Sequence, residues 1–392
     1  MTSIDRRRFL QFGTAGAALG FGTHGASGAA ATATATAFQT ATEQMIRLSG
    51  DGLGLTPDNA VKLLGRLADD KGIPADAYSN GGVVEELEQA FAAALDKERA
   101  VFMPTGTLAN HLAVRALAGG PSRAIVQAES HLYNDTGDTL QTLSSIKLVP
   151  LAPGRATFTL DDVRALLDRT ASGRVATPVS VISIESPVRR KTGEAFDEAE
   201  MDRITAFARA EGIRTHLDGA RIFLQAGFTG RSVAEYARMF DTVYVSLYKY
   251  FNAPSGAILA GPRALLDEMF HTRRMFGGGL ARVWPFAAIA LHYFEGFSER
   301  YAQAVRVSNE WKRLVAGHEA FAIEPIPSGT NLFRLRVSGI DATKLRDRLA
   351  NQGVRLPAPL ADGSGFGLAV NESWGRTTAS DLAARFVRAV DA

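Results

Sequence analysis

Length, composition and charge describe an ordinary globular chain and exclude several classes of function. The 392 residues, 46% of them hydrophobic, are enough for a large domain and a smaller lobe. A formal net charge of +2 indicates neither nucleic acid nor an anionic membrane surface as a partner, and no metal site is predicted. Because there is no cysteine, disulfides, thiolate nucleophiles and cysteine-bound zinc are excluded.

Residues 1–37 are predicted to be an export signal that is removed. Two arginines, one further residue and Phe-Leu within residues 6–10 resemble the twin-arginine motif. A short, Gly-rich apolar run at residues 12–21 and a small-residue tract at residues 29–37 follow, with Phe38 as the expected mature start. The alternative is a disordered basic tail. We therefore expect a periplasmic or otherwise exported protein that is not held in a membrane in its mature form.

The next part of the chain alternates between helical and strand-like patterns. Thr56 and Pro57 mark a helix start, and apolar residues recur at helical spacing over residues 82–95. Seven apolar runs are predicted as buried strands: residues 100–103, 124–127, 147–151, 179–184, 214–217, 242–247 and 257–260. Helical patterns separate most of them, at residues 160–169, 198–210 and 233–240. This alternation predicts an α/β fold, with a mainly parallel sheet covered by helices on both faces.

The end of the chain is predicted to form a smaller lobe. Residues 284–314 have the pattern of one long helix that leads into it. Strand and helix patterns then follow at residues 330–337, 342–351, 367–370 and 380–390. We expect a large domain with an N-terminal arm over residues 38–285, then a linking helix and a small C-terminal α/β domain over residues 286–392.

Polar residues follow four of the predicted strands, where open α/β sheets bind ligands. A small-residue turn at Gly106 opens a helix and offers N–H groups to a phosphate. His131 and Asp218 follow two further strands, and Asp218 could hold a ring nitrogen protonated. Lys249 lies at a buried strand end, where desolvation lowers the pKa of an amine and favours a Schiff-base nucleophile. Taken singly, these features have plainer alternatives: a capped turn, a structural histidine and a helix cap.

Together, the segments resemble the threonine aldolase/β-eliminating lyase family of fold-type-I pyridoxal-phosphate (PLP) enzymes. The matching segments are Pro-Thr-Gly-Thr-Leu-Ala-Asn at 104–110, His-Leu-Asp-Gly-Ala-Arg at 216–221, the lysine before Ala-Pro-Ser-Gly at 253–256, and Arg-Arg-Met-Phe-Gly-Gly-Gly at 273–279. The resemblance covers about residues 45–300 and implies an aspartate-aminotransferase-like fold with PLP as the cofactor.

The resemblance implies a role for each matched residue. Lys249 would carry the cofactor, Asp218 would pair with its pyridinium nitrogen, and His131 would lie over its ring and help to move a proton. The other implied contacts are those of Gly106 and Thr107 with the phosphate, of Arg221 with the cofactor, of Ser49 with the substrate carboxylate, and of Tyr78 with a neighbouring subunit's site.

The sequence departs from the family's pattern where the substrate would be recognised. Tyr248 and Tyr250 flank the lysine where the family has Ser and Gly, and Gly367 stands where the family has a carboxylate-binding arginine. Three other arginines are candidates to replace it: Arg190, and the predicted substrate contacts Arg282 and Arg376. The alternative for each is a solvated surface residue.

We expect a PLP-dependent lyase that cleaves a β-hydroxy-α-amino acid into glycine, or a relative, and an aldehyde. The expected assembly is a homodimer or homotetramer. Two alternatives remain. One is another PLP reaction on the same scaffold, namely β-elimination, transamination or racemisation. The other is an exported PLP-fold binding protein without turnover.

Overall fold

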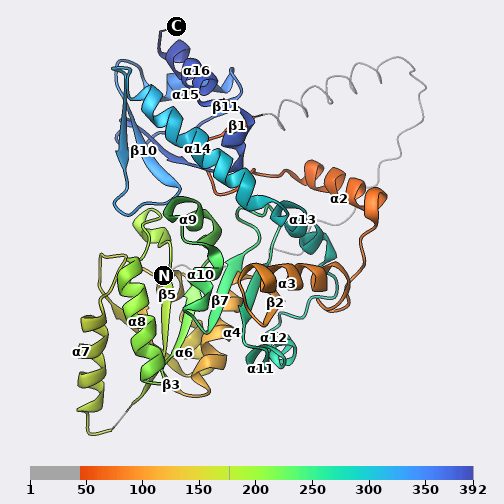
Figure 1. Ribbon diagram of the computed structural model, residues 1–392, viewed down its shortest axis with the longest axis vertical. Coiled ribbons are helices and arrows are strands. Elements are labelled where there is room, and N and C mark those ends of the chain that lie inside the picture. The colour runs from red at the N-terminus through yellow and green to blue at the C-terminus, as the bar shows by residue number, and fades with distance from the viewer. Residues whose placement is uncertain (1–44, 176, 392) are drawn as a thin grey trace, which may run out of the picture. The chain divides into compact units, whose positions relative to one another are not determined.

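A seven-stranded sheet forms the centre of the described chain, which comprises residues 45–391 without residue 176 in the computed structural model (Figure 1). The predicted export signal lies outside the described residues. The strand order is β2-β8-β7-β6-β5-β3-β4. The strands are Arg99–Met103 (β2), Ser122–Gln127 (β3), Ile146–Leu151 (β4), Val179–Glu185 (β5), Arg214–Asp218 (β6), Thr242–Ser246 (β7) and Ala257–Gly261 (β8). Only β8 runs antiparallel to its neighbours in this sheet, so the predicted, mainly parallel α/β sheet is confirmed.

Helices cover this sheet and explain why its strands are almost continuously apolar. The helix α4 (Gly106–Ala118) packs against β5 to β8, α8 (Glu198–Ala210) against β6, and α3 (Gly82–Ala94) against β2 and β8. The other helices of this part are α2 (Pro57–Lys71), α5 (His131–Asn134), α6 (Thr139–Ser144), α7 (Leu160–Ala171), α9 (Ile222–Thr229), α10 (Val233–Arg238), α11 (Arg263–Leu266) and α12 (Met269–Met275). Side-chain oxygens of Thr105, Thr159 and Ser232 cap α4, α7 and α10 by accepting from free N–H groups of the first turn.

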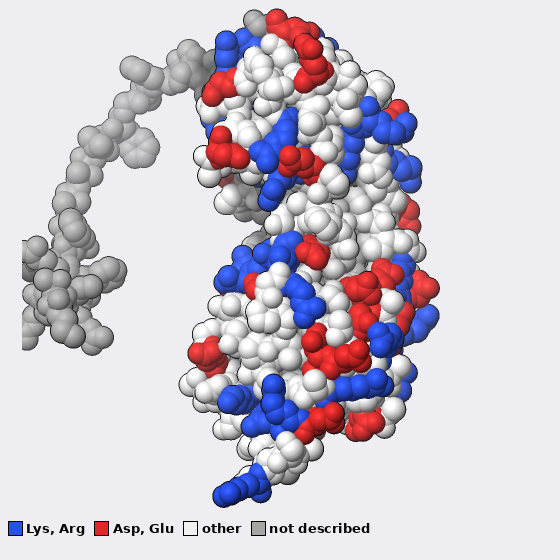
Figure 2. All heavy atoms as spheres, turned by 90° about the vertical axis from the view of Figure 1, so that its left-hand side faces the viewer, with Lys and Arg blue, Asp and Glu red and all other residues white. Residues whose placement is uncertain are grey.

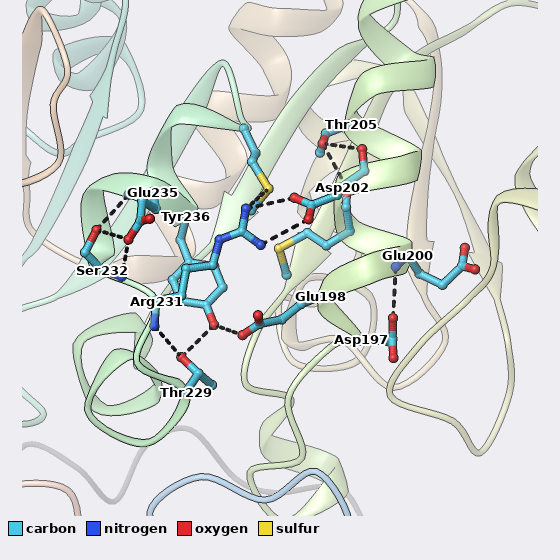
Figure 3. Close-up of polar contacts among 12 residues, drawn as sticks. Asp197, Glu198, Glu200, Asp202, Thr205, Thr229, Arg231, Ser232, Glu235 and Tyr236 are labelled. Atoms are coloured by element: carbon cyan, nitrogen blue, oxygen red, sulfur yellow. Dashed lines mark hydrogen bonds and ion pairs between the residues drawn. The ribbon is translucent and has the colours of Figure 1, made fainter.

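A polar cluster fixes the corner between α8 and α10 (Figure 3). Arg231 forms an ion pair of 2.8 Å with Asp202, and the Tyr236 hydroxyl donates to Glu198 and lies 2.9 Å from the Thr229 hydroxyl. Burial and the bond to Glu198 raise the pKa of Tyr236 to about 12, so the phenol stays protonated as a donor. The cluster joins two helices on the covering layer and holds them in place.

The smaller lobe is built on a three-stranded antiparallel sheet of order β12-β10-β9. Its strands are Phe321–Pro325 (β9), Leu332–Val337 (β10) and Gly365–Ala369 (β12), with α15 (Ala342–Ala350) and α16 (Ala379–Asp391) beside them. A two-residue strand near the start of the described chain, Ile46–Arg47 (β1), pairs in parallel with Val354–Arg355 (β11). The start of the described chain is thereby attached to the lobe formed by residues near its end. The division of domains at residue 285 stays a prediction.

The prediction of one long helix over residues 284–314 is wrong, because two helices occupy this segment. They are α13 (Trp284–Phe294) and α14 (Phe297–Val315). Gly296 between them has a φ of +65°, a left-handed conformation that interrupts the helical hydrogen bonds. Arg300 donates to the carbonyl oxygens of Tyr293 (2.7 Å) and Glu295 (2.5 Å) at this break.

Surface charge and hydropathy follow the composition. Basic and acidic side chains are mixed on the face shown in Figure 2, without a large area of one sign. None of the helices in the described part of the chain is both long and apolar enough to cross a membrane.

Candidate active site

A cavity of about 1010 Å³ opens where β5, β6 and β7 end, and most of the predicted site residues line it. These residues are Ser49, Gly106, Thr107, His131, Asp218, Arg221 and Lys249. They come from five separate segments of the chain. The carboxyl ends of parallel strands meet at one edge of a sheet, and this explains how they converge.

The surroundings of Lys249 make its amine easier to deprotonate than a lysine amine in water. It follows β7 and is half-buried, with its Nζ 5.7 Å from the centre of the Tyr248 ring. Burial, followed by the positive charge of Arg221, lowers the pKa of Lys249 to about 8. A neutral amine is the nucleophilic form, so this lysine is suited to attack a carbonyl carbon near neutral pH.

Asp218 is buried at the end of β6 and is held by a chain of hydrogen bonds. Its Oδ2 accepts from Nδ2 of Asn110 at 2.6 Å, and Oδ1 of Asn110 lies 2.9 Å from Nε2 of His216. Burial lowers the pKa of His216 to about 4, so this histidine is neutral. Its Nε2–H therefore donates to Asn110, while Nδ1 accepts from the Thr242 hydroxyl at 2.8 Å. The chain orients a carboxylate toward the cavity.

Arg221 is paired within the cavity wall. Its Nε donates to Oδ2 of Asp51 at 2.8 Å, and both side chains are more than four-fifths buried. Although burial acts against the charged form, the Asp51 carboxylate raises the pKa of Arg221. This ion pair ties the segment after β1 to the large sheet, across 170 positions of the sequence.

Glu185, the last residue of β5, is a buried carboxyl group beside Asp218. It accepts from the backbone N–H groups of His131 (2.5 Å) and Arg189 (2.9 Å). Burial, and next the charge of Asp218, raise the pKa of Glu185 to about 7. The Nδ1 atom of His131 is buried and has no hydrogen-bond partner among the described residues. A proton can therefore be held or exchanged near neutral pH on this side of the cavity.

Gly106 and Thr107 begin α4 and offer unpaired backbone N–H groups to the cavity. A Cβ atom at Gly106 would lie 2.0 Å from the Tyr244 hydroxyl oxygen, so only glycine fits here. A helix N-terminus of this kind suits a phosphate group.

Several residues that were predicted to contact the substrate or a neighbouring subunit's site lie outside the cavity. Arg282 is exposed and donates to the carbonyl oxygen of Ala281, and Arg376 is exposed and donates to that of Met45; neither lines the cavity. Arg190 pairs with Asp135 at 2.7 Å. Tyr78 is about half exposed, beside Arg274 and outside the cavity.

The cavity wall also contains five charged residues to which the sequence assigned no role. They are Arg47, Asp51, Asp135, Glu185 and Arg189. Of these, Glu185 could have been found from the sequence. It is a carboxylate at the end of a strand whose other residues are valine, isoleucine and serine. Tyr250, the second tyrosine beside Lys249, is buried in the core against Phe251 and Phe297 and does not line the cavity.

The sheet order, the covering helices and a lysine–aspartate pair at the strand ends define a fold-type-I PLP enzyme. The sequence profile of the beta-eliminating lyase family matches residues 73–335, and the chain belongs to this family. Its cofactor is pyridoxal 5′-phosphate. The residues present fit that group, since they offer an amine with a lowered pKa, a buried carboxylate and free N–H groups next to a glycine that cannot be replaced without a clash.

Individual relatives agree with this assignment. The low specificity L-threonine aldolase of Saccharomyces cerevisiae (strain ATCC 204508 / S288c) is 29% identical over 228 residues, which are 58% of this chain and 55% of that protein. The match thus spans little more than half the length of this relative.

Two solved structures superpose over nearly their whole length. A protein of Exiguobacterium sp. 255-15, assigned as an aromatic amino acid beta-eliminating lyase/threonine aldolase, is 27% identical with a TM-score of 0.74, over 90% of this chain and 98% of that one. A protein of Listeria monocytogenes EGD-E, assigned as an L-allo-threonine aldolase, is 28% identical with a TM-score of 0.71, over 91% and 99%.

Proposed function

We propose that this chain is a PLP-dependent carbon–carbon lyase that cleaves a β-hydroxy-α-amino acid into glycine, or a relative, and an aldehyde. The observation that carries the proposal is the meeting of Lys249, Asp218, His131 and Glu185 on one cavity. The similarity to proteins assigned as threonine aldolases supports this reaction class.

The binding roles follow from the position of each residue. Lys249, which is partly neutral near pH 8, would carry the cofactor on its amine. Gly106 and Thr107 would hold the phosphate with N–H groups, and Asp218 would keep the ring nitrogen protonated. Bound PLP would supply an electron sink for the pair released from the Cα–Cβ bond.

Two residues can move the proton that cleavage releases. The base must remove a proton from the β-hydroxyl group, and His131, which lines the cavity, is the candidate, directly or through a water. Glu185, with a pKa near 7, can exchange a proton with water or substrate on the same side of the cavity. The two groups lie together because the Glu185 carboxylate accepts from the His131 backbone.

The test is product analysis with the holoprotein. Threonine, allo-threonine and phenylserine should each be tried, and equal amounts of glycine and aldehyde are expected from at least one. His131→Gln should lower the turnover number about 10²- to 10⁴-fold while the visible absorbance of the cofactor persists. If no aldehyde forms from any of the three, the lyase proposal is wrong and a binding protein without turnover becomes the better account.

β-Elimination is the second candidate, because the Exiguobacterium protein's assignment includes a β-eliminating lyase. Both reactions use an electron sink, and they differ in which bond to Cα or Cβ breaks. Ammonia and a keto acid, formed from an amino acid with a leaving group on Cβ, would indicate elimination. Glycine and an aldehyde would indicate cleavage.

We also propose export through the twin-arginine pathway, on the basis of residues 6–37. Substitution of Arg6 and Arg7 by lysine should leave the protein in the cytoplasm with its original N-terminus. Cleavage and export that continue unchanged in that variant would contradict this proposal.

Self-association into a homodimer or homotetramer is the proposed assembly. Tyr78, Met275 and Leu280 expose 47%, 77% and 38% of their surface, more than is usual for large apolar side chains. Light scattering on the purified mature protein should give at least twice the chain mass, and a monomer would contradict the proposal.

A further inference from the structure

Arg47 forms part of the cavity wall and is not one of the residues assigned to the cofactor. It ends β1 and is half-buried, and its guanidinium group lies over the Cα atom of Gly54. A Cβ atom at Gly54 would lie only 2.5 Å from Cζ of Arg47. The absence of a side chain at position 54 therefore makes room for this guanidinium.

The backbone around Arg47 is held firmly, and this fixes where its side chain starts. The N–H group of Arg47 donates to the Ser373 hydroxyl at 2.8 Å, and its carbonyl oxygen accepts from Nδ2 of Asn371 at 3.1 Å. Parallel pairing with Arg355 adds a third restraint. A binding group is more effective when its support is rigid in this way.

The guanidinium of Arg47 differs from the other two on the cavity wall in having no anionic partner. Arg221 pairs with Asp51 and Arg189 with Asp135, whereas Arg47 has no side-chain hydrogen bond or ion pair with any described residue. Its Nε atom is also buried without a hydrogen-bond partner.

The surroundings of Arg47 add positive charge and no compensating negative charge. Burial, then the charges of Arg355 and Arg376, lower the pKa of Arg47. A partly buried cation beside like charges is unfavourable unless an anion joins it. The site therefore has an unmet preference for a negative group.

We propose that Arg47 binds a carboxylate group of the substrate. A guanidinium can donate two parallel N–H bonds to a carboxylate, and Arg47 lines the same cavity as the reactive amine of Lys249. The inference rests on the proposed function only in taking an amino acid as the ligand.

The carboxylate that Arg47 binds can be the α-carboxylate or a second carboxylate on the substrate side chain. Binding measurements with ligands that have one, two or no carboxylates distinguish these two cases.

The experiment compares the holoprotein with Arg47→Gln, using the visible spectrum of the bound cofactor to follow binding. The ligands are glycine with one carboxylate, aspartate with two, and 2-aminoethanol with none. Loss of a charge-assisted hydrogen-bond pair should weaken carboxylate binding about 10- to 100-fold and leave 2-aminoethanol unchanged. Weakening of both acids indicates the α-carboxylate, and weakening of aspartate alone indicates the side-chain carboxylate.

Three further variants guard against a purely structural effect. Arg355→Gln is the matched control, because it removes the same charge from the paired strand at a residue outside the cavity, and it should bind all three ligands normally. Arg47→Lys keeps the positive charge but cannot donate two parallel N–H bonds to one carboxylate. It should bind the carboxylate ligands with an affinity between those of wild type and Arg47→Gln. Gly54→Ala, which displaces the guanidinium without removing it, should weaken the same ligands as Arg47→Gln.

Several results would overturn the proposal. They are equal affinities in wild type and Arg47→Gln, equal weakening of all three ligands, loss of the cofactor itself, and a wild-type spectrum that responds to none of the ligands. Binding is read without turnover, so the two proposals can fail separately. A chain that binds glycine through Arg47 and cleaves nothing would contradict only the lyase proposal.

Discussion

The charged residues of the cavity wall are of two kinds. Among the residues assigned to the cofactor, Asp218 accepts from Asn110 and Arg221 pairs with Asp51, so both of these charged groups already have partners. The guanidinium of Arg47, on the same cavity wall, has no such partner among the described residues.

The origin of the residues differs in the same way. Asp218 ends β6 and Lys249 follows β7, two adjacent strands of one buried sheet. Arg47 lies on a two-residue strand that pairs with β11, between the beginning and the end of the described chain. A resident cofactor needs a preformed site with its hydrogen bonds in place, whereas a substrate that comes and goes can itself complete an unpaired group.

Replacing Lys249 with Ala should have the largest effect, because it removes the amine that carries the cofactor. Turnover should fall at least ~10³-fold, and borohydride reduction should no longer attach a pyridoxyl group to the chain. Lys249→Arg should behave alike, since a guanidinium keeps the charge but is not a nucleophile. If borohydride attaches the pyridoxyl group of the wild-type protein to another lysine, the assignment of Lys249 as the cofactor lysine is wrong.

Asp218→Asn should lower turnover about 10²- to 10³-fold, because a neutral amide no longer favours a protonated ring nitrogen. Asn110→Ala leaves the carboxylate but removes the 2.6 Å bond that orients it, so a smaller loss, about 10-fold, is expected. Steady-state kinetics and the visible spectrum check both. Equal losses of turnover in the two variants would mean that the orientation of the Asp218 carboxylate matters as much as its charge.

Gly106→Ala should weaken PLP binding about 10-fold, because its Cβ atom would lie 2.0 Å from the Tyr244 hydroxyl oxygen and force the start of α4 to shift. The matched control is Gly120→Ala, where nothing lies within 4 Å of the new Cβ atom. Equilibrium dialysis of PLP against the cofactor-free protein measures the difference. Unchanged binding in Gly106→Ala would show that the helix start does not hold the phosphate.

The pH dependence of cofactor loading should be the smallest effect, a change of at most about 10-fold between pH 7 and the plateau. The pKa of Lys249 is lowered to about 8, so below that pH its amine is mostly protonated and above it mostly neutral. The rate at which the cofactor-free protein takes up PLP should therefore rise from pH 7 and level off above about pH 8 to 9. A rate that is still rising at pH 10 would contradict the lowered pKa.

Much of the large sheet could be read from the sequence. Parallel strands are buried on both faces, so they appear as short, continuous apolar runs, and all seven predicted runs correspond to strands. The polar residues after these runs converge for the same reason, since the strand ends lie at one edge. That places Gly106, Asp218 and Lys249 on one cavity.

Local patterns could not show where the helix breaks. Apolar spacing continues through residues 284–314, and the single glycine that interrupts it is tolerated in many helices. Only the left-handed φ of Gly296, with Arg300 satisfying the carbonyl oxygens, decides that α13 and α14 are separate.

By itself, then, the sequence determined the α/β class, the strands and the residues that follow them, because these depend on burial along short stretches of chain. The tertiary structure decided which arginines face the cavity. Arg282 and Arg376 point elsewhere, whereas Arg47 reaches the cavity through the pairing of β1 with β11 and the space left by Gly54. The pairing of β1 with β11 joins residues about 300 positions apart, and a local pattern does not contain the packing that brings them together.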